Sequence, residues 1–279
     1  MKKILLTGAS GFLGSRIYTY YKDKYYMITP SHSEVDITEW DSILHYYEQH
    51  NPDIVIHCAA ISDTGICEKN PELSFTVNVT GSEHIAKASS LFGAKCILCS
   101  SDQVYCNSDY NNANYESDIL TPYNVYGKHK LSAEHSCLEF NADSVHLRLA
   151  WMYDSNIDMT ASRNDFAKQL LHAINKKTEL ALPVNDKRGI ADVWEVVKNI
   201  EKTFDLPGGA YNFGSPNQKS TYETALSVLT SLHCDTSFLT EKVYDNARNL
   251  SMNQDKLNSF GIYFSSTEDA LIQCLTKFI

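Results

Sequence analysis

Short apolar runs alternate with longer amphipathic stretches through the first half of the chain. Polar positions do not interrupt the runs, as expected for strands that are buried on both faces of a parallel sheet. Expected strands lie at 3–7, 25–29, 53–60, 95–100 and 144–150, and expected helices at 12–24, 40–50, 71–92 and 126–140. Repeated strand–helix units join parallel strands through right-handed crossovers. The pattern therefore predicts an α/β fold with a doubly wound parallel sheet of the Rossmann type.

The pattern changes after Trp151. A polar stretch at 154–165 precedes an expected helix, and further elements follow at wider intervals: helices at 165–176, 193–204, 221–232 and 267–278, and a strand at 210–214. We interpret 1–154 as the main domain, with a return to the sheet near 186–214. A smaller, discontinuous C-terminal domain comprises 155–185 and 215–279. The Asn-rich segment 106–118 is expected to be an exposed loop.

Composition excludes several classes of protein. The net charge of −10, from 24 basic and 34 acidic residues, disfavours a nucleic-acid binder but allows an anionic small substrate. There is no apolar run long enough to span a membrane, and the apolar run at the start is too short for a signal peptide. We expect a cytoplasmic protein whose eight cysteines are reduced thiols.

Cys96 and Cys99 have the spacing of half a zinc or redox site. They lie in an expected buried strand, where residues three apart face opposite sides of the sheet. The two sulfurs should not converge, so we predict no metal site.

A glycine-rich turn follows the first expected strand. Gly8, Gly11 and Gly14 come directly before and within the start of the first helix. Glycines in this place allow a tight turn, close approach of a pyrophosphate, and close packing of helix on sheet. The helix N-terminus adds N–H groups and a partial positive charge. This arrangement predicts a dinucleotide site.

The end of the second strand carries no carboxylate where an acid would bind the ribose hydroxyls of NAD. An acid there would repel a 2′-phosphate, so its absence favours NADP(H) while leaving NAD(H) usable. Ser31, His32 and Arg16 are the nearby candidate donors to that phosphate.

The segment "PYNVYGKHK" holds two tyrosines and two lysines. Only Tyr126 and Lys130 are four residues apart, and so only they share one face of a helix. Ser100 and Ser101 end the fourth expected strand, at the carboxyl edge where open α/β sheets bind ligands. A hydroxyl, a phenol and an ammonium can therefore converge there.

Taken together, these motifs resemble the extended short-chain dehydrogenases/reductases. The matching segments are "TGASGFLG" (7–14), "DIT" (36–38), "PDIVIHCAA" (52–60), "NVTG" (78–81), "SSDQVY" (100–105), "YESD" (115–118) and "PYNVYGKHK" (122–130). Within that superfamily the chain is most similar to the dTDP-4-dehydrorhamnose reductases, through "NPELSFTVNVTG", "LRLAWMY" (147–153) and "ARNLSMNQDKL" (247–257).

The resemblance implies roles for matching positions. Tyr126 would protonate a carbonyl oxygen, Lys130 would lower the pKa of that phenol and hold the nicotinamide ribose, and Ser101 would bind the substrate carbonyl. The main domain would bind NAD(P), and the smaller domain would bind substrate. The implied cofactor contacts, besides Tyr126 and Lys130, are Gly8, Ser10, Gly11, Phe12, Leu13, Gly14, Ser31, Asp36, Ile37, Cys58, Ala59, Ala60 and Ser100.

Two departures from the related enzymes matter. Gln103 replaces the glutamate of the related 4,6-dehydratases, and an amide cannot transfer the proton that elimination requires. The segment Ser62–Gly65 replaces the usual Thr-Ala-Val-Asp of the reductases in a loop that borders the substrate.

The resemblance implies reduction of a keto group on a nucleotide-linked deoxysugar, as in dTDP-rhamnose biosynthesis, without membrane or nucleic-acid partners. Candidate substrate contacts are Tyr105, Trp151, Arg188 and Arg248. A homodimer is also implied, since related enzymes often pair through two helices beside the sheet. Two alternatives stay open: a sugar-nucleotide epimerase with the same triad, and a regulatory NADP-binding subunit like the methionine adenosyltransferase β subunit.

Overall fold

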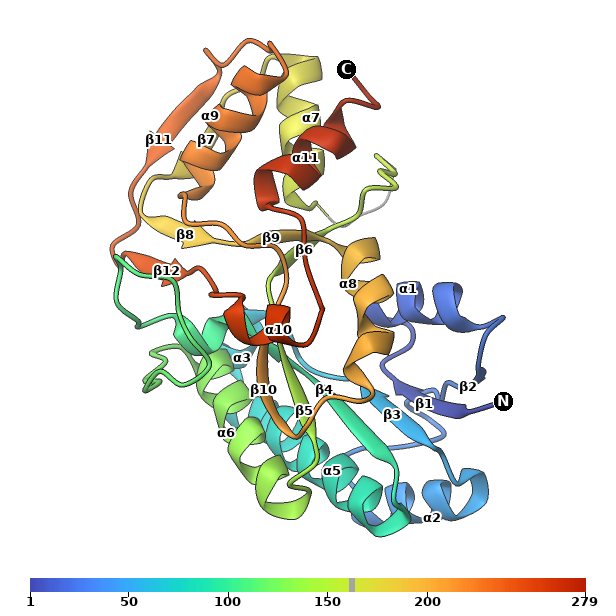
Figure 1. Ribbon diagram of the computed structural model, residues 1–279. Helices are drawn as coiled ribbons and strands as arrows, with labels where there is room; N and C mark the ends of the chain where they lie inside the picture. Colours follow the sequence, from blue (N-terminus) through green and yellow to red (C-terminus); the bar gives the residue numbers. More distant parts are fainter. Residues whose placement is uncertain (161–163) are drawn as a thin grey trace. The chain divides into compact units, whose positions relative to one another are not determined.

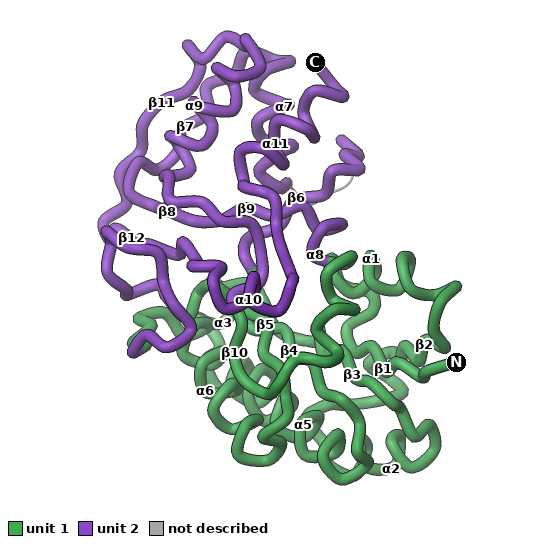
Figure 2. Tube along the Cα trace, viewed as in Figure 1, with its two compact units in different colours: residues 1–104, 120–149, 197–211 green, residues 105–119, 150–196, 212–279 purple. Residues whose placement is uncertain are grey.

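The computed structural model describes residues 1–160 and 164–279; part of the polar stretch, at 161–163, lies outside the described residues (Figure 1). The chain divides into two compact units (Figure 2). Unit 1 comprises Met1–Val104, Leu120–Leu149 and Val197–Tyr211, and unit 2 comprises Tyr105–Ile119, Ala150–Val196 and Asn212–Ile279. Each unit is therefore built from three separate chain segments. The assignment of cofactor and substrate to separate domains stays a prediction.

A six-stranded sheet with the order β10-β5-β4-β3-β1-β2 forms the centre of unit 1. Its strands are β1 (Lys3–Thr7), β2 (Tyr26–Ile28), β3 (Ile54–His57), β4 (Lys95–Ser101), β5 (Val145–Leu149) and β10 (Gly209–Phe213). The pairs β1–β2, β1–β3, β3–β4 and β4–β5 are parallel. The strand order reverses at β1, because β2 lies on one side of it and β3 on the other. This confirms the predicted doubly wound sheet.

Helices cover the sheet of unit 1. They are α1 (Phe12–Tyr21), α2 (Trp40–His50), α3 (Thr64–Lys69), α4 (Pro71–Phe75), α5 (Gly81–Phe92) and α6 (Val125–Phe140). Ile43 of α2, Ile85 of α5 and Cys137 of α6 belong to one buried apolar cluster with Leu5 and Val55 of the sheet. These three helices therefore cover the same face of the sheet.

The expected helix at 71–92 is three pieces. A π-helical turn, Thr76–Thr80, separates α4 from α5. Within this turn Asn78 is fully buried, and its amide side chain accepts a hydrogen bond from the Ile61 backbone N–H and donates one to the Ile61 carbonyl, at 2.8 and 2.9 Å. The turn thus fixes the loop that follows β3.

Unit 2 contains three small parallel sheets that the sequence pattern did not predict. They pair β7 (Leu180–Pro183) with β11 (Leu239–Lys242), β8 (Asp186–Arg188) with β12 (Arg248–Leu250), and β6 (Trp151–Tyr153) with β9 (Ile190–Asp192). Strands of three or four residues with mixed polarity lack the run length and alternation that mark a strand in sequence. Pairing with a distant partner, rather than local pattern, forms them.

The helices of unit 2 enclose a second apolar core. They are α7 (Phe166–Lys176), α9 (Thr221–Ser231) and α11 (Thr267–Leu275). The short helix α10 (Asp255–Ser259) also belongs to unit 2. Helix α8 (Val193–Ile200) and the 3₁₀ turn Glu201–Thr203 continue from unit 2 into unit 1. Phe166, Val228 and Leu271 are buried in this second core. Side chains at Asp165, Ser220 and Ser266 accept hydrogen bonds from the first turns of α7, α9 and α11, which explains where these helices begin.

The Asn-rich segment 106–118 is an irregular and mostly exposed loop, as expected from sequence, but it has a buried anchor. Asn114 is buried and forms a bridge to Met252. Its side-chain amide donates to the carbonyls of Asn249 and Ser251 at 3.0 and 2.8 Å. The segment is therefore tied into unit 2 by hydrogen bonds that its composition does not reveal.

Across the described ranges, the helices are all too short or too polar to cross a lipid bilayer.

Candidate active site

The turn between β1 and α1 requires glycine at two positions. Gly8 has a φ of 69°, and a Cβ on it would lie 2.6 Å from the backbone nitrogen of Ala59. A Cβ on Gly14 would lie 2.2 Å from the Gly8 carbonyl oxygen. The Gly11 N–H donates to that same carbonyl at 3.0 Å, and helix α1 begins without a side-chain cap. The turn is therefore packed against the residues after β3 and presents an uncapped helix N-terminus.

A buried network beneath this turn was not found from sequence. The Thr7 hydroxyl is hydrogen-bonded to Nδ1 of His57 at 2.7 Å, and His57 Nε2 is 3.2 Å from the Ser82 hydroxyl. Burial lowers the pKa of His57 to about 3, with Lys130 contributing in the same direction. The imidazole is thus neutral and joins β1, β3 and α5.

The turn after β2 does contain a carboxylate, that of Glu34, which the sequence analysis did not consider. The Glu34 carboxylate accepts hydrogen bonds from the backbone N–H and the hydroxyl of Ser31, at 2.8 and 2.7 Å. These bonds lower the pKa of Glu34. Asp36 accepts from the Thr38 N–H and hydroxyl, and so stabilises its own turn. Ser31 is therefore already engaged by an anion.

Ser100 and Ser101 point to different partners, as alternation along a strand requires. The Ser100 hydroxyl donates to Glu134, and Glu134 forms a buried ion pair with Arg148, with its Oε2 2.7 Å from Nη2. Burial alone would raise the pKa of Glu134, but the Arg148 contacts lower it overall. Ser100 thus belongs to an internal network that joins β4, α6 and β5.

Ser101 lies beside Tyr126 at the carboxyl end of β4, and both side chains are buried. Helix α6 is capped by Asn124, whose Oδ1 accepts from the Gly127 N–H at 2.6 Å and whose Nδ2 donates to Gln103 Oε1 at 3.1 Å. A Cβ on Gly127 would lie 2.4 Å from the Gln103 carbonyl oxygen. This close packing sets the first turn of α6, and with it Tyr126, against the end of β4.

Burial raises the pKa of the Tyr126 phenol, and a hydrogen bond with Ser101 lowers it only in part. The net direction is opposite to the one expected from Lys130 acting on the phenol. The Lys130 Nζ lies 5.8 Å from the centroid of the Tyr126 ring and donates to the Cys99 carbonyl at 2.8 Å. Burial also lowers the pKa of Lys130. The phenol is therefore held protonated.

The structure brings together the predicted cofactor residues that follow the first and third strands. Ala59 is adjacent to the Gly8 turn, and its N–H donates to the Thr7 hydroxyl at 3.4 Å. Cys58 lies beside Cys99, with 3.5 Å between the sulfur atoms. Cys96 is buried in the apolar core on the other face of the sheet, so Cys96 and Cys99 do not converge. No group of three or more metal-binding side chains occurs within the described part of the chain.

The four candidate substrate contacts all lie in unit 2. Tyr105 is fully buried, and its hydroxyl donates to Asn212 Oδ1 at 2.8 Å. Arg248 donates to both carboxylate oxygens of Asp186, at 2.6 and 3.1 Å. Both side chains therefore have structural partners within unit 2.

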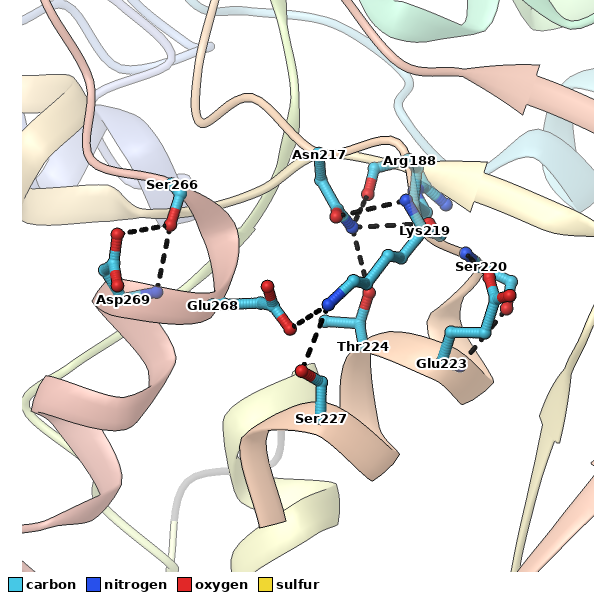
Figure 3. Close-up of polar contacts among 10 residues, drawn as sticks. All are labelled: Arg188, Asn217, Lys219, Ser220, Glu223, Thr224, Ser227, Ser266, Glu268 and Asp269. Carbon is cyan, nitrogen blue, oxygen red and sulfur yellow. Dashed lines mark hydrogen bonds and ion pairs between the residues drawn. The ribbon is translucent and has the colours of Figure 1, made fainter. Parts of the chain in front are cut away.

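Arg188 and Trp151 lie together. The guanidinium carbon of Arg188 is 5.0 Å from the centroid of the Trp151 ring. The backbone carbonyl of Arg188 accepts a hydrogen bond from the side-chain amide of Asn217 at 2.9 Å, and the same amide donates to the Thr224 hydroxyl (Figure 3). The sequence analysis proposed Arg188 and Trp151 as separate candidates. In the structure they form one cation–aromatic contact.

Residues 1–254 match the family described as the RmlD substrate binding domain. The spore coat polysaccharide biosynthesis protein SpsK of Bacillus subtilis strain 168 is 28% identical over 250 residues, which cover 88% of this chain and 86% of SpsK. The methionine adenosyltransferase 2 subunit beta of Rattus norvegicus is 26% identical over 284 residues, covering 94% of this chain and 83% of that protein.

A crystal structure of a dTDP-4-dehydrorhamnose reductase from Bacillus anthracis, in complex with NADP, has the same fold. It matches with a TM-score of 0.86 at 22% identity and covers 99% of each chain. The match over residues 1–254 confirms the resemblance indicated by the motifs, and the chain belongs to the RmlD substrate-binding domain family.

Proposed function

We propose that the protein is an NAD(P)H-dependent oxidoreductase that reduces a keto group on a nucleotide-linked deoxysugar, as a dTDP-4-dehydrorhamnose reductase does. The observation that carries the proposal is the placement of Ser101, Tyr126 and Lys130 at the carboxyl end of β4. All three side chains are buried in unit 1, where a proton donor and a cation are protected from bulk water.

The Gly8–Gly14 turn fits a dinucleotide. Its two obligatory glycines and the uncapped start of α1 leave room and N–H groups for a pyrophosphate. The predicted contact at Ile37 would hold the adenine, and those at Ala59 and Ala60, just after β3, would hold the cofactor backbone. NADPH is the preferred cofactor in this proposal, in line with the Bacillus anthracis reductase solved with NADP, and NADH is usable. When bound, the cofactor supplies hydride.

The protein's own groups handle the substrate oxygen and its proton. The Ser101 hydroxyl binds and orients the carbonyl oxygen. Because burial keeps the Tyr126 hydroxyl protonated, it donates its proton to that oxygen as the alcohol forms. The buried ammonium of Lys130 favours the phenolate that remains, which helps the donation.

Gln103 argues for reduction and against dehydration. Its amide oxygen accepts from the Asn124 side chain, and so supports the cap of α6. An amide supplies no ionisable proton for removal of water. Ser101, Tyr126 and Lys130 suffice for reversible hydride transfer to a ketone.

For the sugar nucleotide, the proposal rests on Arg188 and Trp151. A stacked arginine and indole offer a cation for a diphosphate and an aromatic face for a base or sugar. Tyr105 and Arg248 have structural partners, so we give them no role in binding.

The experiment mixes purified protein with NADPH and dTDP-4-keto-6-deoxy sugars and follows the absorbance of the reduced nicotinamide. Stoichiometric loss of absorbance, with one reduced sugar formed per NADPH, is the expected result. Interconversion of sugars without net oxidation identifies an epimerase instead. UDP- and GDP-linked sugars tested in parallel identify the nucleotide.

A second candidate is a regulatory subunit that binds cofactor without turnover. It is favoured by the 26% identity to the methionine adenosyltransferase 2 subunit beta over 94% of this chain. Tight NADPH binding with no oxidation by any nucleotide sugar, together with co-purification of a partner enzyme, would select this candidate.

A further inference from the structure

Two cysteines on neighbouring strands of unit 1 lie side by side. The register of β3 and β4 pairs Ile54 with Lys95 and continues to His57 with Leu98, so Cys58 and Cys99 are the next residues opposite each other. Their sulfur atoms are 3.5 Å apart. Both residues are partly exposed. The two thiols are therefore close in space, in residues that are partly rather than fully enclosed.

The backbone geometry suits a covalent bond between these two residues. Paired strands run about 4.8 Å apart, which lies within the range of Cα separations that disulfides bridge. The sulfurs would need to approach to about 2 Å, a movement that rotation of the two side chains can supply. Cys96 lies on the other face of β4 and is buried, so it does not compete.

The surroundings shift the pKa values of the two thiols in opposite directions. The hydrogen bond from Cys58 lowers the pKa of Cys99, and the charge of Lys130 acts in the same direction, which together outweigh burial. The same hydrogen bond raises the pKa of Cys58, and burial adds to this. Lys130 is held beside Cys99 by its hydrogen bond to the Cys99 carbonyl. Cys99 is thus the thiol that ionises more readily.

We propose that Cys58 and Cys99 are an oxidation site that forms a reversible disulfide when a hydroperoxide is present. The Cys99 thiolate attacks one peroxide oxygen, which breaks the O–O bond and leaves a sulfenic acid and hydroxide. The Cys58 sulfur then attacks the Cys99 sulfur and expels its hydroxyl group. The two protons lost by the thiols end in water, so two thiols and one hydrogen peroxide yield one disulfide and two waters.

This site goes beyond the reductase activity and does not depend on it. No substrate or cofactor takes part in the reaction, so the chemistry can be tested on the protein alone. Failure of the disulfide to form would leave the proposed reduction of a sugar untouched, and the converse also holds.

The test treats the reduced protein with hydrogen peroxide, alkylates the remaining thiols, digests without reductant and analyses the peptides by mass spectrometry. A peptide that links Cys58 to Cys99, and that dithiothreitol releases, is expected. Cys58→Ser and Cys99→Ser should each abolish it. The matched control Cys234→Ser alters another partly exposed thiol, in unit 2, and should retain it.

The order of events is tested with dimedone, which traps sulfenic acids. In Cys58→Ser, dimedone should label Cys99, because the partner that resolves the sulfenic acid is missing. In Cys99→Ser, Cys58 should be labelled much more slowly. Peroxide-treated wild-type protein in which both cysteines are alkylated or irreversibly oxidised, with no linked peptide, would overturn the proposal whether or not the variants fold.

Discussion

Tyr126 is the side chain on which the proposed chemistry depends most directly. Tyr126→Phe removes the proton donor but keeps the ring, so turnover should fall by roughly 100-fold or more while cofactor affinity stays nearly unchanged. Lys130→Ala should reduce both. Steady-state kinetics and a fluorescence titration measure the two effects. The matched control is Tyr123→Phe, at an exposed tyrosine of the same segment. Full activity of Tyr126→Phe on an identified substrate would refute the assignment.

Glu34 gives a second test at the scale of one residue. Its carboxylate holds Ser31, where a 2′-phosphate is predicted to bind, and it opposes that phosphate by charge repulsion. Glu34→Gln should tighten NADPH binding by about fivefold and change NADH binding little. Glu48→Gln, at an exposed acid of α2, is the control. Equal effects on the two cofactors would show that Glu34 does not face the phosphate.

At the scale of elements, the turn between β1 and α1 is the clearest case of a constraint by backbone packing. Gly14→Ala would place a Cβ 2.2 Å from the Gly8 carbonyl oxygen, so the helix must shift from the sheet. We expect a lower melting temperature and loss of NADPH binding. In Gly65→Ala the nearest atom would be a side-chain oxygen of Asp63 at 3.2 Å, so this control should behave as wild type. Normal cofactor binding by Gly14→Ala would contradict the proposed pyrophosphate site.

Long apolar patterns predicted helices and strands well, because the burial of one helix face or of a whole strand requires apolar residues at regular positions nearby in the sequence. Helix α2 begins and ends at Trp40 and His50, as expected from sequence. The π turn at Thr76–Thr80 was not predicted, because it is stabilised by the bonds of Asn78 to Ile61, a residue seventeen positions away. The short strands of unit 2 were missed for the same reason.

In the candidate site, too, some features follow from local backbone geometry and others depend on contacts between separate elements. The spacing of Tyr126 and Lys130 follows from helix geometry, and the alternation of Ser100 and Ser101 follows from strand geometry. The contact of Glu34 with Ser31 depends on how a turn folds back, and the pair of Glu134 and Arg148 joins two elements. Such contacts leave no periodic trace in the sequence.

For the whole molecule, buried histidines predict sensitivity to acid. Burial lowers the pKa of His57 to about 3 and of His146 to about 4. Below pH 6.5 the unfolded chain binds protons that these residues do not bind when folded. Stability is therefore complete above pH 6.5 and is lost as the pH falls toward the folded values. At pH 5 each residue should cost about 2 kcal/mol.

Chemical denaturation at a series of pH values between 8 and 5 measures this loss. His146→Gln should make the decline in unfolding free energy less steep, because one of the buried histidines no longer titrates. His45→Gln, at an exposed histidine of α2, should leave the slope unchanged. An identical slope in wild type and His146→Gln would show that burial of this ring does not control the acid response.

The order in which the strands of unit 1 occur along the chain has a consequence for synthesis on the ribosome. The glycine turn and the Tyr126 helix are complete once Phe140 has been made, yet β10, the neighbour of β5, ends only at residue 213 of 279. Until then β5 is an unpaired apolar edge, which other chains can join. The nascent protein thus carries its proposed catalytic groups well before its sheet is closed. Its window of greatest risk of aggregation is the interval in which residues 150–196, the middle segment of unit 2, are being translated.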